Sequence, residues 1–244
     1  MIKFRRESFD SSILKREVYK MYLSRPLRDE SAIITQLRKI SADSIFCFST
    51  FAPQNIAALE KLGFSLVTIR NTYRFQGLLV KTKSLLKGFR VVADKGILAK
   101  LTVADINRLA DAIGSMSRYY RDPKILRSNA RAIYRNWITN SLYHGYADQC
   151  FAILKGDLLV ALITIKLRQR TGYIDLLGVV PQFQKKGLGA YLVQHCLQYL
   201  NREGFTDIRV ITEGENVAAN ILYQKNNFVI NAVELVYHKH FKNF

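Results

Sequence analysis

The stretch VVPQFQKKGLGAYLVQHCLQYL, residues 179–200, leads from an apolar segment through a proline turn into an amphipathic helix. Two glycines, Gly187 and Gly189, stand where that helix begins, directly after Lys185 and Lys186. Glycines let a ligand approach the backbone closely, and free N–H groups at a helix N-terminus attract phosphate groups. The stretch therefore indicates an anion site, although a structural turn explains the glycines equally well. It is neither a Walker loop nor a dinucleotide fingerprint, because the Gly-Lys-Ser/Thr and the third glycine are missing.

The net charge of the whole chain also favours an anionic partner. Its 244 residues are 49% hydrophobic, which is enough for a sizeable core, and 37 Lys and Arg against 19 Asp and Glu give a formal charge of +18. Such a surface attracts nucleic acid, anionic membranes or phosphorylated small molecules. Because no run of five or six basic residues occurs in the sequence, a basic nucleic-acid-binding tail is not expected.

Three widely separated cysteines, Cys47, Cys150 and Cys196, argue against both a disulfide framework and a zinc site. Their number is odd and no CxxC occurs, so we expect no bound metal. Cys196 lies on the apolar face of a helix and is predicted to be buried. The N-terminus lacks the apolar run of a signal peptide, and no apolar run approaches the roughly 18 residues of a membrane span. We therefore predict a cytoplasmic protein.

Helix and strand patterns alternate along the chain and predict an α/β fold. Gly63 is expected to end one helix in a left-handed conformation, and Thr102 is expected to cap another. The charged segment 81–96 is the best domain boundary. The expected elements are a helix in the segment from residue 30 that precedes a strand at 45–48, a helix at 54–63, a strand from 65, helices at 102–117 and 123–146, a hairpin turning at 156–157, strands at 172–180, 207–212 and 228–239, and helices from 187 and at 218–225.

Two segments, 44–67 and 207–230, share the order strand, short loop, Asn-x-Ala-Ala, helix and Phe-led strand. Asn55 in the first segment corresponds to Asn216 in the second. Chance similarity between short α/β units is the alternative explanation. If the repeat is real, its first copy is degenerate, because it has no Gly-x-Gly and no tyrosine at the position of Tyr223. We therefore expect the chemistry in the second half.

Residues 149–239 resemble the GNAT superfamily of acyl-CoA N-acyltransferases. The first family signature, Gln/Arg-x-x-Gly-x-Gly/Ala after a strand that ends in apolar-x-Val, is found at residues 184–189. The second, Asn-x-x-Ala-x-x-x-Tyr-x-x-x-Gly-Phe, matches at four positions: Asn216, Ala219, Tyr223 and Phe228. Asn227 replaces the usual glycine, but asparagine also tolerates a left-handed conformation. One helix and one strand separate the two signatures, as in the family.

The resemblance implies a mixed, mostly antiparallel sheet with flanking helices and a site for acyl-CoA, with acetyl-CoA as the default. Backbone N–H groups of residues 185–190 would bind the pyrophosphate, and the pantetheine arm would lie between two splayed strands near 177–179, with Asn216 on its other side. Tyr223 would protonate the leaving thiolate, because a phenol with a pKa near ~10 stays protonated at neutral pH; a simple packing role is the alternative. The implied coenzyme-binding positions are Leu177, Gly178, Val179, Gln184, Lys185, Lys186, Gly187, Leu188, Gly189, Ala190 and Asn216.

The sequence leaves the general base open. Asp175 shares a strand face with Tyr173 and Leu177, so it is one candidate, but a structural hydrogen bond explains it at least as well. Glu213 and Glu215 precede Asn216 in a loop. A backbone carbonyl or solvent could also take the proton from the attacking amine.

The preceding segment narrows the resemblance to the TDP-fucosamine acetyltransferase group, which are sugar-nucleotide N-acyltransferases of the same superfamily. The matching residues are Ser117, Arg118, Tyr119, Tyr134, Trp137, Ile138, Asn140, Gln149 and Cys150. The group carries a smaller domain before its GNAT domain, which implies a degenerate GNAT-like α/β domain at 1–90 and a GNAT domain at 91–244. Arg118 and Tyr119 are candidates for acceptor binding, since Arg binds diphosphates and aromatic rings stack on bases or sugars. Trp137 is expected to pack into the core.

These patterns together predict an N-acyltransferase for a nucleotide-linked amino-deoxyhexose of the dTDP-sugar type, used in a bacterial surface glycan such as O-antigen, lipopolysaccharide or capsule. Both substrates are polyanions, so the positive charge requires no nucleic-acid partner. One alternative is a GNAT enzyme that acts on a protein, peptide or small-molecule amine. The other is a nucleic-acid-binding protein with a decayed acyl-CoA site. The apolar strand at 228–239 could pair with a second chain to give a homodimer.

Overall fold

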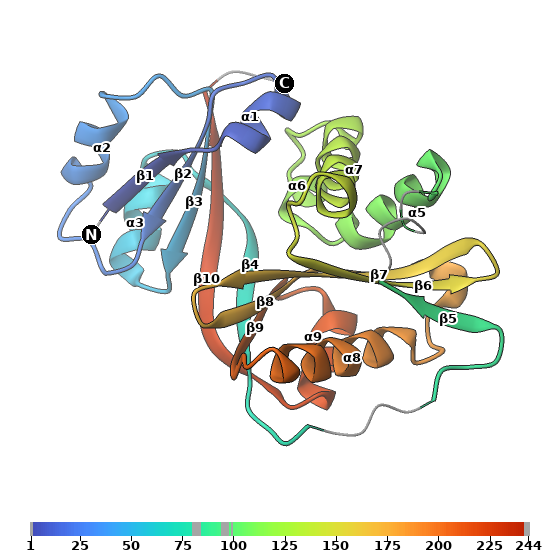
Figure 1. The fold of residues 1–244 in the computed structure, drawn as a ribbon. Helices are drawn as coiled ribbons and strands as arrows, with labels where there is room; N and C mark the ends of the chain where they lie inside the picture. The colour runs from blue at the N-terminus through green and yellow to red at the C-terminus, as the bar shows by residue number, and fades with distance from the viewer. Residues whose placement is uncertain (1, 80–83, 94–97, 99, 242–244) are drawn as a thin grey trace.

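Ten strands in the described part of the chain form one continuous sheet (Figure 1). The computed structural model describes residues 2–79, 84–93, 98 and 100–241. The sheet runs in the order β1-β2-β3-β10-β4-β9-β8-β7-β6-β5. Its strands are β1 (Ile2–Arg6), β2 (Val18–Leu23), β3 (Ser44–Thr50), β4 (Ser65–Phe75), β5 (Phe89–Val92), β6 (Gln149–Lys155), β7 (Leu158–Arg168), β8 (Thr171–Val179), β9 (Asp207–Glu213) and β10 (Phe228–His240).

Helices flank both faces of this sheet (Figure 1). They are α1 (Ser8–Leu14), α2 (Ser31–Leu37), α3 (Pro53–Lys61), α5 (Val103–Gly114), α6 (Arg118–Arg121), α7 (Arg127–Tyr143), α8 (Leu188–Arg202) and α9 (Val217–Lys225), with a short 3₁₀ turn at Pro181–Phe183. The predicted mixed, mostly antiparallel sheet is confirmed, because among the described strands only the pairs β2–β3 and β8–β9 are parallel. A helix connects the strands of each parallel pair, as a parallel crossover requires.

The two halves of the chain exchange their last strands. β4 lies between β9 and β10, and β10 lies between β3 and β4. The two segments with similar sequences form β3–α3–β4 and β9–α9–β10, which meet at the antiparallel β4–β10 pair. The halves therefore cannot separate without breaking strand pairs, and the sheet continues from one into the other.

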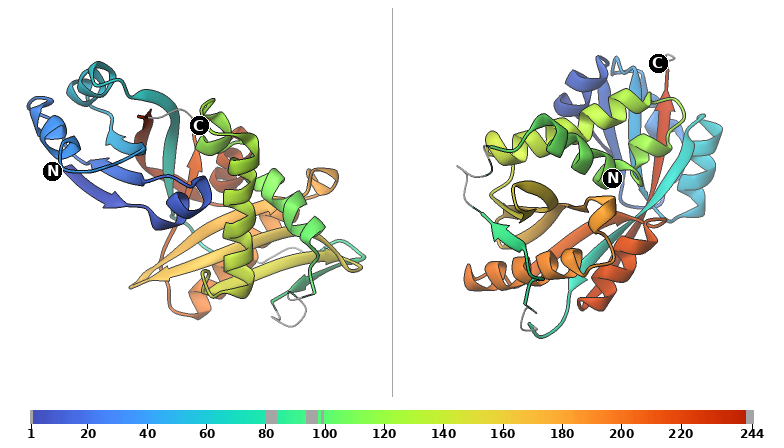
Figure 2. Two further views of the ribbon diagram at one scale, coloured as in Figure 1. Left: turned by 90° about the horizontal axis from the view of Figure 1, so that it is seen from above. Right: turned by 90° about the vertical axis from the view of Figure 1, so that its right-hand side faces the viewer.

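Two apolar layers hold the second half of the sheet. Helices α5 and α7 cover one face of β6–β8, and α8 covers the other (Figure 2). Leu109 and Ile133 belong to the first layer, and Leu192 and Cys196 belong to the second. Each of these four side chains is fully buried, which confirms the prediction for Cys196. Packing from both faces fixes the strand ends around which the site is built.

Most of the predicted elements are present, and several local details are confirmed. Thr102 caps α5 in a reciprocal capping box with Asp105. Gly63 and Asn227 adopt positive φ values of 73° and 61° where helices end. The predicted linker at 81–96 lies partly outside the described residues, and the predicted boundary between 90 and 91 falls within β5, which pairs with β6. That boundary stays a prediction.

Candidate active site

A cavity of about 230 Å³ opens where β8 and β9 diverge. The two strands are paired at their starts, and the last pair is Ile174 with Val210. Beyond this point β8 stays paired with β7 and β9 stays paired with β4. The expected splayed strands are therefore β8 and β9. The polar and aromatic lining consists of Arg70, Arg118, Tyr134, Trp137, Lys166, Arg168, Tyr173, Asp175, Thr212, Glu213, Asn216 and Tyr223.

A β-bulge in β8 lies at the point of divergence. Ile174 faces Ile165 on β7, and Leu176 faces Thr164, so Asp175 is an extra residue with no partner opposite it. The backbone N–H of Leu176 donates to the side-chain oxygen of Thr164 at 3.0 Å. A bulge bends its strand and redirects a side chain. Here it coincides with the one carboxylate that β8 contributes to the cavity.

Tyr223 on α9 forms part of the cavity wall and is only 4% exposed. Its ring packs against Tyr73 and Phe228, with centroid distances of 5.9 and 5.7 Å. Burial raises the pKa of the Tyr223 hydroxyl well above its ordinary value, and the negative charge of Glu213 adds to the effect. The hydroxyl is therefore protonated at neutral pH. The Tyr223 side chain therefore packs in the core and also lines the cavity.

Asn216 lines the cavity and also begins α9. Its Oδ1 accepts a hydrogen bond from the backbone N–H of Ala219 at 3.2 Å, so the side chain caps the helix. Sequence reasoning missed Asn220, one turn further on. Its amide nitrogen donates to the carbonyls of Glu213, Gly214 and Asn216 at 3.0, 3.1 and 2.7 Å, which fixes the loop between β9 and α9. A second asparagine four residues after the first is the signal that could have revealed it.

The Gly-x-Gly segment forms a tight turn at the start of α8. Lys185 and Gly187 adopt positive φ values of 59° and 77°. The backbone N–H groups of residues 185–190 have no internal acceptor within this fully described segment. The Gln184 side-chain amide donates to the Val179 carbonyl at 3.0 Å and ties the turn to the end of β8. The turn presents free amides beside two exposed lysines, which is a suitable arrangement for a phosphate group.

The implied coenzyme-binding positions fall in two places. Leu177 and Asn216 line the cavity. The others lie at the end of β8, at residues 178 and 179, or in the turn and first residues of α8, at 184–190. The splayed strands and the turn are consecutive along the chain, so they form two parts of one continuous edge.

The structure separates the two candidates for acceptor binding. Arg118, the first residue of α6, lines the cavity. Tyr119 is 1% exposed, does not line the cavity, and donates its hydroxyl to Asp10 at 2.8 Å. Successive residues of a helical turn point in different directions, which is why one faces the cavity and the other the core. The predicted contact between Tyr119 and an acceptor therefore does not fit. Its ring instead lies 4.2 Å from the Arg118 guanidinium and supports it.

Trp137 has a polar role that its helical spacing did not indicate. Its indole Nε1 donates to Asp175 Oδ2 at 2.9 Å, and both residues line the cavity. Burial raises the pKa of Asp175, although the Trp137 hydrogen bond and the charges of Lys166 and Arg168 oppose this effect. Sequence spacing gave no signal for the pair, because α7 and β8 approach one another only in the folded chain.

The charges around the cavity are mostly positive. The cations Arg70, Arg118, Lys166 and Arg168 line it, against the carboxylates of Asp175 and Glu213. Arg70 also contacts Glu234 at 2.5 Å. Burial raises the pKa of Glu213, and the positive charge of Arg118 opposes that shift. A cavity with this lining favours an anionic ligand over a cationic one.

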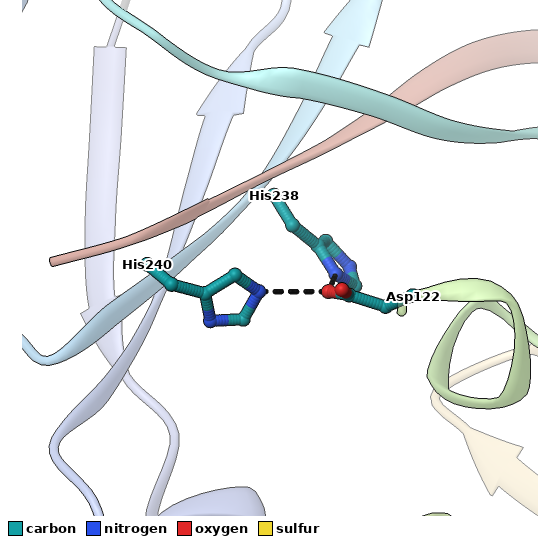
Figure 3. A group of neighbouring side chains, drawn as sticks. All are labelled: Asp122, His238 and His240. Atoms are coloured by element: carbon teal, nitrogen blue, oxygen red, sulfur yellow. Dashed lines mark hydrogen bonds and ion pairs between the residues drawn. The ribbon is translucent and has the colours of Figure 1, made fainter. Parts of the chain in front are cut away.

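A second buried cluster joins the C-terminal strand to α6 (Figure 3). Asp122 Oδ2 accepts hydrogen bonds from His238 Nδ1 at 2.6 Å and His240 Nε2 at 2.7 Å, and Ser44 Oγ lies 2.8 Å from His240 Nδ1. The three side chains have a composition that could hold a metal ion. Two ligands of one zinc ion lie roughly 3 Å or more apart, given its bond lengths. The shorter spacings here are those of hydrogen bonds, so we name Asp122, His238 and His240 the His–Asp latch.

Comparison with known proteins agrees with this geometry. Residues 115–228 match the Acetyltransferase (GNAT) family. The chain also shares its fold with a GCN5-related N-acetyltransferase from Sphaerobacter thermophilus, at a TM-score of 0.66 and 10% identity, over 98% of this chain and 76% of the other. The fold of the whole chain and the family match over residues 115–228 both agree with the predicted similarity to the GNAT superfamily.

Two curated relatives show how far this similarity extends. The spore coat polysaccharide biosynthesis protein SpsD of Bacillus subtilis is 26% identical over 122 residues, which are 50% of this chain and 42% of that protein. The N-alpha-acetyltransferase 30 of Xenopus laevis is 35% identical over 92 residues, 35% of this chain and 33% of that protein. The match thus spans less than half of each relative.

Within the described ranges, no helix has the length and apolar character needed to cross a membrane.

Proposed function

We propose that this protein is an acyl-CoA-dependent N-acyltransferase that acylates the amino group of a nucleotide-linked amino-deoxyhexose. The observation that carries the proposal is the cavity, where four cations stand beside the aromatic rings of Trp137 and Tyr173. A diphosphate suits the cations, and a sugar or base suits the rings. The relative that is named for spore coat polysaccharide biosynthesis favours an acceptor that is destined for a bacterial surface glycan.

The donor is assigned to the edge formed by β8 and the start of α8. The free amides of residues 185–190, with Lys185 and Lys186, would hold the pyrophosphate of acyl-CoA. Residues 177–179 have no strand partner on the β9 side and would bind the pantetheine arm. Because Asn216 Oδ1 already caps α9, its side chain would reach the arm only through its amide nitrogen.

The chemistry is a direct attack of the acceptor amine on the thioester. Tyr223 is the candidate acid for the departing thiolate, because its side chain lines the cavity and its hydroxyl stays protonated. Cys196 is fully buried on α8, which does not line the cavity, so we assign it no role as a covalent nucleophile.

A protein or peptide amine is the second candidate acceptor. The N-alpha-acetyltransferase 30 relative favours it. The positive cavity disfavours strongly cationic acceptors, polyamines above all. A nucleic-acid-binding protein with a decayed site is disfavoured by the free amides at the start of α8 and by Tyr223 in the cavity wall.

The proposal is tested by the release of free thiol from acetyl-CoA and longer acyl-CoAs, in the presence of nucleotide-linked 3- and 4-amino-deoxyhexoses or of peptide amines. Turnover with one amino sugar is the expected result. Release with peptides alone would establish the second candidate in its place. Tight coenzyme binding without turnover of any pair would remove the support for the acceptor.

Replacing Tyr223 by Phe removes the proposed acid and keeps the packed ring. We expect kcat to fall about 10²–10⁴-fold, the usual contribution of a positioned acid, while the affinity for acyl-CoA stays within a few-fold of wild type. Steady-state thiol release and calorimetric binding of CoA measure the two quantities. Tyr199→Phe on α8, away from the cavity lining, is the matched control. Equal turnover in Tyr223→Phe would remove its assigned role.

A further inference from the structure

We propose that Asp175 is the general base for the acceptor amine and that the indole of Trp137 holds its carboxylate in place. This inference rests on the proposed N-acyltransferase function and supplies the proton acceptor that the sequence left open. It is carried by three observations: a strand bulge at Asp175, a hydrogen bond from the neighbouring helix, and a shared position in the cavity wall.

The bulge explains why this carboxylate reaches the cavity. Asp175 is the extra residue between the pairs that Ile174 and Leu176 make with β7, and β8 parts from β9 directly after Ile174. Asp175 therefore lies at the first position of β8 after its pairing with β9 ends, and its side chain lines the cavity that the thioester of a bound donor would enter. The side chain of Tyr223 lines the same cavity from α9, the helix that follows β9, so the candidate base comes from β8 and the candidate acid comes from the β9 side of the splay.

Trp137 can hold Asp175 because the indole itself is fixed. Its ring stacks on Tyr134, with a centroid distance of 5.8 Å and an interplanar angle of 25°. Tyr146 and Phe9 pack edge-on against it at 6.3 and 6.4 Å, and Phe9 comes from α1 in the first half of the chain. An indole N–H can only donate, so its bond to Oδ2 favours the ionised carboxylate in one orientation.

The second carboxylate of the cavity, Glu213, is less suited to the task. The backbone N–H of Arg118 hydrogen-bonds to it, and the positive charge of Arg118 is the strongest influence opposing the effect of its burial. Removing the charge of Glu213 would leave the buried guanidinium less compensated. Glu213 is therefore a partner of Arg118, whereas the protein partner of Asp175 is the neutral indole.

The proton balance of the proposed step is complete. Asp175 takes a proton from the ammonium form of the acceptor, and the neutral amine attacks the thioester carbonyl carbon, forming the C–N bond. Collapse of the tetrahedral adduct breaks the C–S bond. Tyr223 gives its proton to the sulfur and regains one from the adduct nitrogen. The proton on Asp175 then leaves to solvent, so the products are the amide, free CoA and one proton.

Trp137 is the only tryptophan of the chain, so its fluorescence reports directly on Asp175. The charged and titratable groups that face the same region are Lys166 and Arg168 on β7, Tyr173 on β8, Tyr134 on α7, Tyr146 after α7, Arg118 on α6, Arg70 on β4, Glu213 on β9 and Tyr223 on α9. We expect a titration of the emission with a midpoint above the usual ~4 of an aspartate, and its loss in Asp175→Asn. The absence of a transition, or the same transition in the variant, would overturn the pairing.

Kinetics test the catalytic part of the proposal. In Asp175→Asn we expect kcat to fall about 10²–10⁴-fold near neutral pH with little change in the KM for acyl-CoA. The deficit should shrink as the pH rises, because more of the acceptor is then already a free amine. Trp137→Phe should cause a smaller loss and shift the midpoint of the pH profile, which a purely structural role would not do. Asp157→Asn, at the exposed β6–β7 turn, is the matched control.

The two proposals fail in different ways. If wild-type protein turns over peptides and no nucleotide sugar, the acceptor assignment fails, and Asp175→Asn is compared with wild type on the peptide. A wild-type kcat and pH profile in Asp175→Asn, with whichever amine is used, would overturn the base assignment while the acyltransferase function stands.

Discussion

At the scale of single residues, Asn220 shows how one amide fixes several parts of the candidate site. Its nitrogen donates to three backbone carbonyls of the β9–α9 connection. Its oxygen accepts from the Tyr73 hydroxyl at 2.8 Å and from the Asn71 amide at 3.1 Å. The side chain thus joins β4 to the end of β9, which carries Glu213, and to α9, which carries Tyr223. Cavity geometry on this side depends on a residue that itself does not line the cavity.

Asn220→Asp tests this dependence. The substitution preserves size and the acceptor for Tyr73, but places a carboxylate oxygen against the carbonyls that Asn220 now binds. We expect the free energy of unfolding to fall by about 1–3 kcal/mol, the cost of leaving such groups unsatisfied, and turnover to fall with it. Urea unfolding and thiol release measure the two effects. Asn231→Asp, exposed on β10, is the control, and equal losses in both variants would contradict the assigned role.

At the scale of elements, the two glycines at the start of α8 have different reasons for being glycine: one is required by the backbone conformation and the other by ligand binding. Gly187 has a φ of 77°, which favours glycine for backbone reasons. Gly189 lies within the helix, and a Cβ there would meet Leu222 at 3.4 Å and Val179 at 3.8 Å, which are ordinary contacts. The protein itself therefore tolerates alanine at 189, and close approach of a ligand is the remaining reason for glycine.

Gly189→Ala should accordingly keep or slightly raise stability, since alanine is the better helix former, and weaken CoA binding by about tenfold, or ~1.4 kcal/mol. Gly187→Ala should lower both, because its backbone conformation becomes strained by about 1 kcal/mol. Thermal unfolding and calorimetric titration with CoA distinguish the two variants. Unchanged CoA affinity in Gly189→Ala would place the pyrophosphate elsewhere.

The elements that the sequence predicted are those with strong local patterns. α8 and α9 follow family signatures, and α5 has both a capping box and a clear apolar period. The missed elements are short or weakly patterned: β1 has 5 residues, α1 has 7, α6 and β5 have 4 each, and β2 does not alternate regularly between buried and open positions. The conformation of the missed strands is set by their neighbours in the sheet, which a single sequence does not display.

At the scale of the whole molecule, the exchange of β4 and β10 was beyond sequence reasoning. Either strand would show the same alternation whether it paired within its own half or with the other, so only the assembled sheet reveals the choice. The Asp175 bulge was hidden for a similar reason, because a bulge is a difference in residue count between two paired strands. The exchange also places the end of β10 beside β3 and α6, where the His–Asp latch forms.

The latch should make the stability of the whole molecule sensitive to acid. Burial lowers the pKa of His238 to about 4, with a further lowering by the charge of Arg118, although the hydrogen bond and charge of Asp122 oppose this shift. An unfolded histidine has a pKa of about 6.5, so the unfolded chain binds a proton more readily. Above about pH 6.5, His238 is neutral in both the folded and the unfolded chain, so its lowered pKa does not reduce the free energy of unfolding. As the pH falls from there towards 4, the unfolded chain binds the proton first, and the free energy of unfolding decreases. Burial alone would raise the pKa of Asp122, but its two imidazole hydrogen bonds lower it below the ordinary value, so its own contribution is lost only at still lower pH.

Urea unfolding between pH 7 and pH 4 measures this effect, and His238→Gln isolates it. Glutamine can still donate to Asp122 but does not titrate. We expect wild type to lose on the order of 2–3 kcal/mol over this range from His238 alone. The variant should be less stable than wild type at pH 7 and should show a flatter dependence, because it lacks the buried imidazole that acid must charge. Identical pH dependence in the two proteins would mean that protonation of His238 is not what lowers the stability of the wild type in acid.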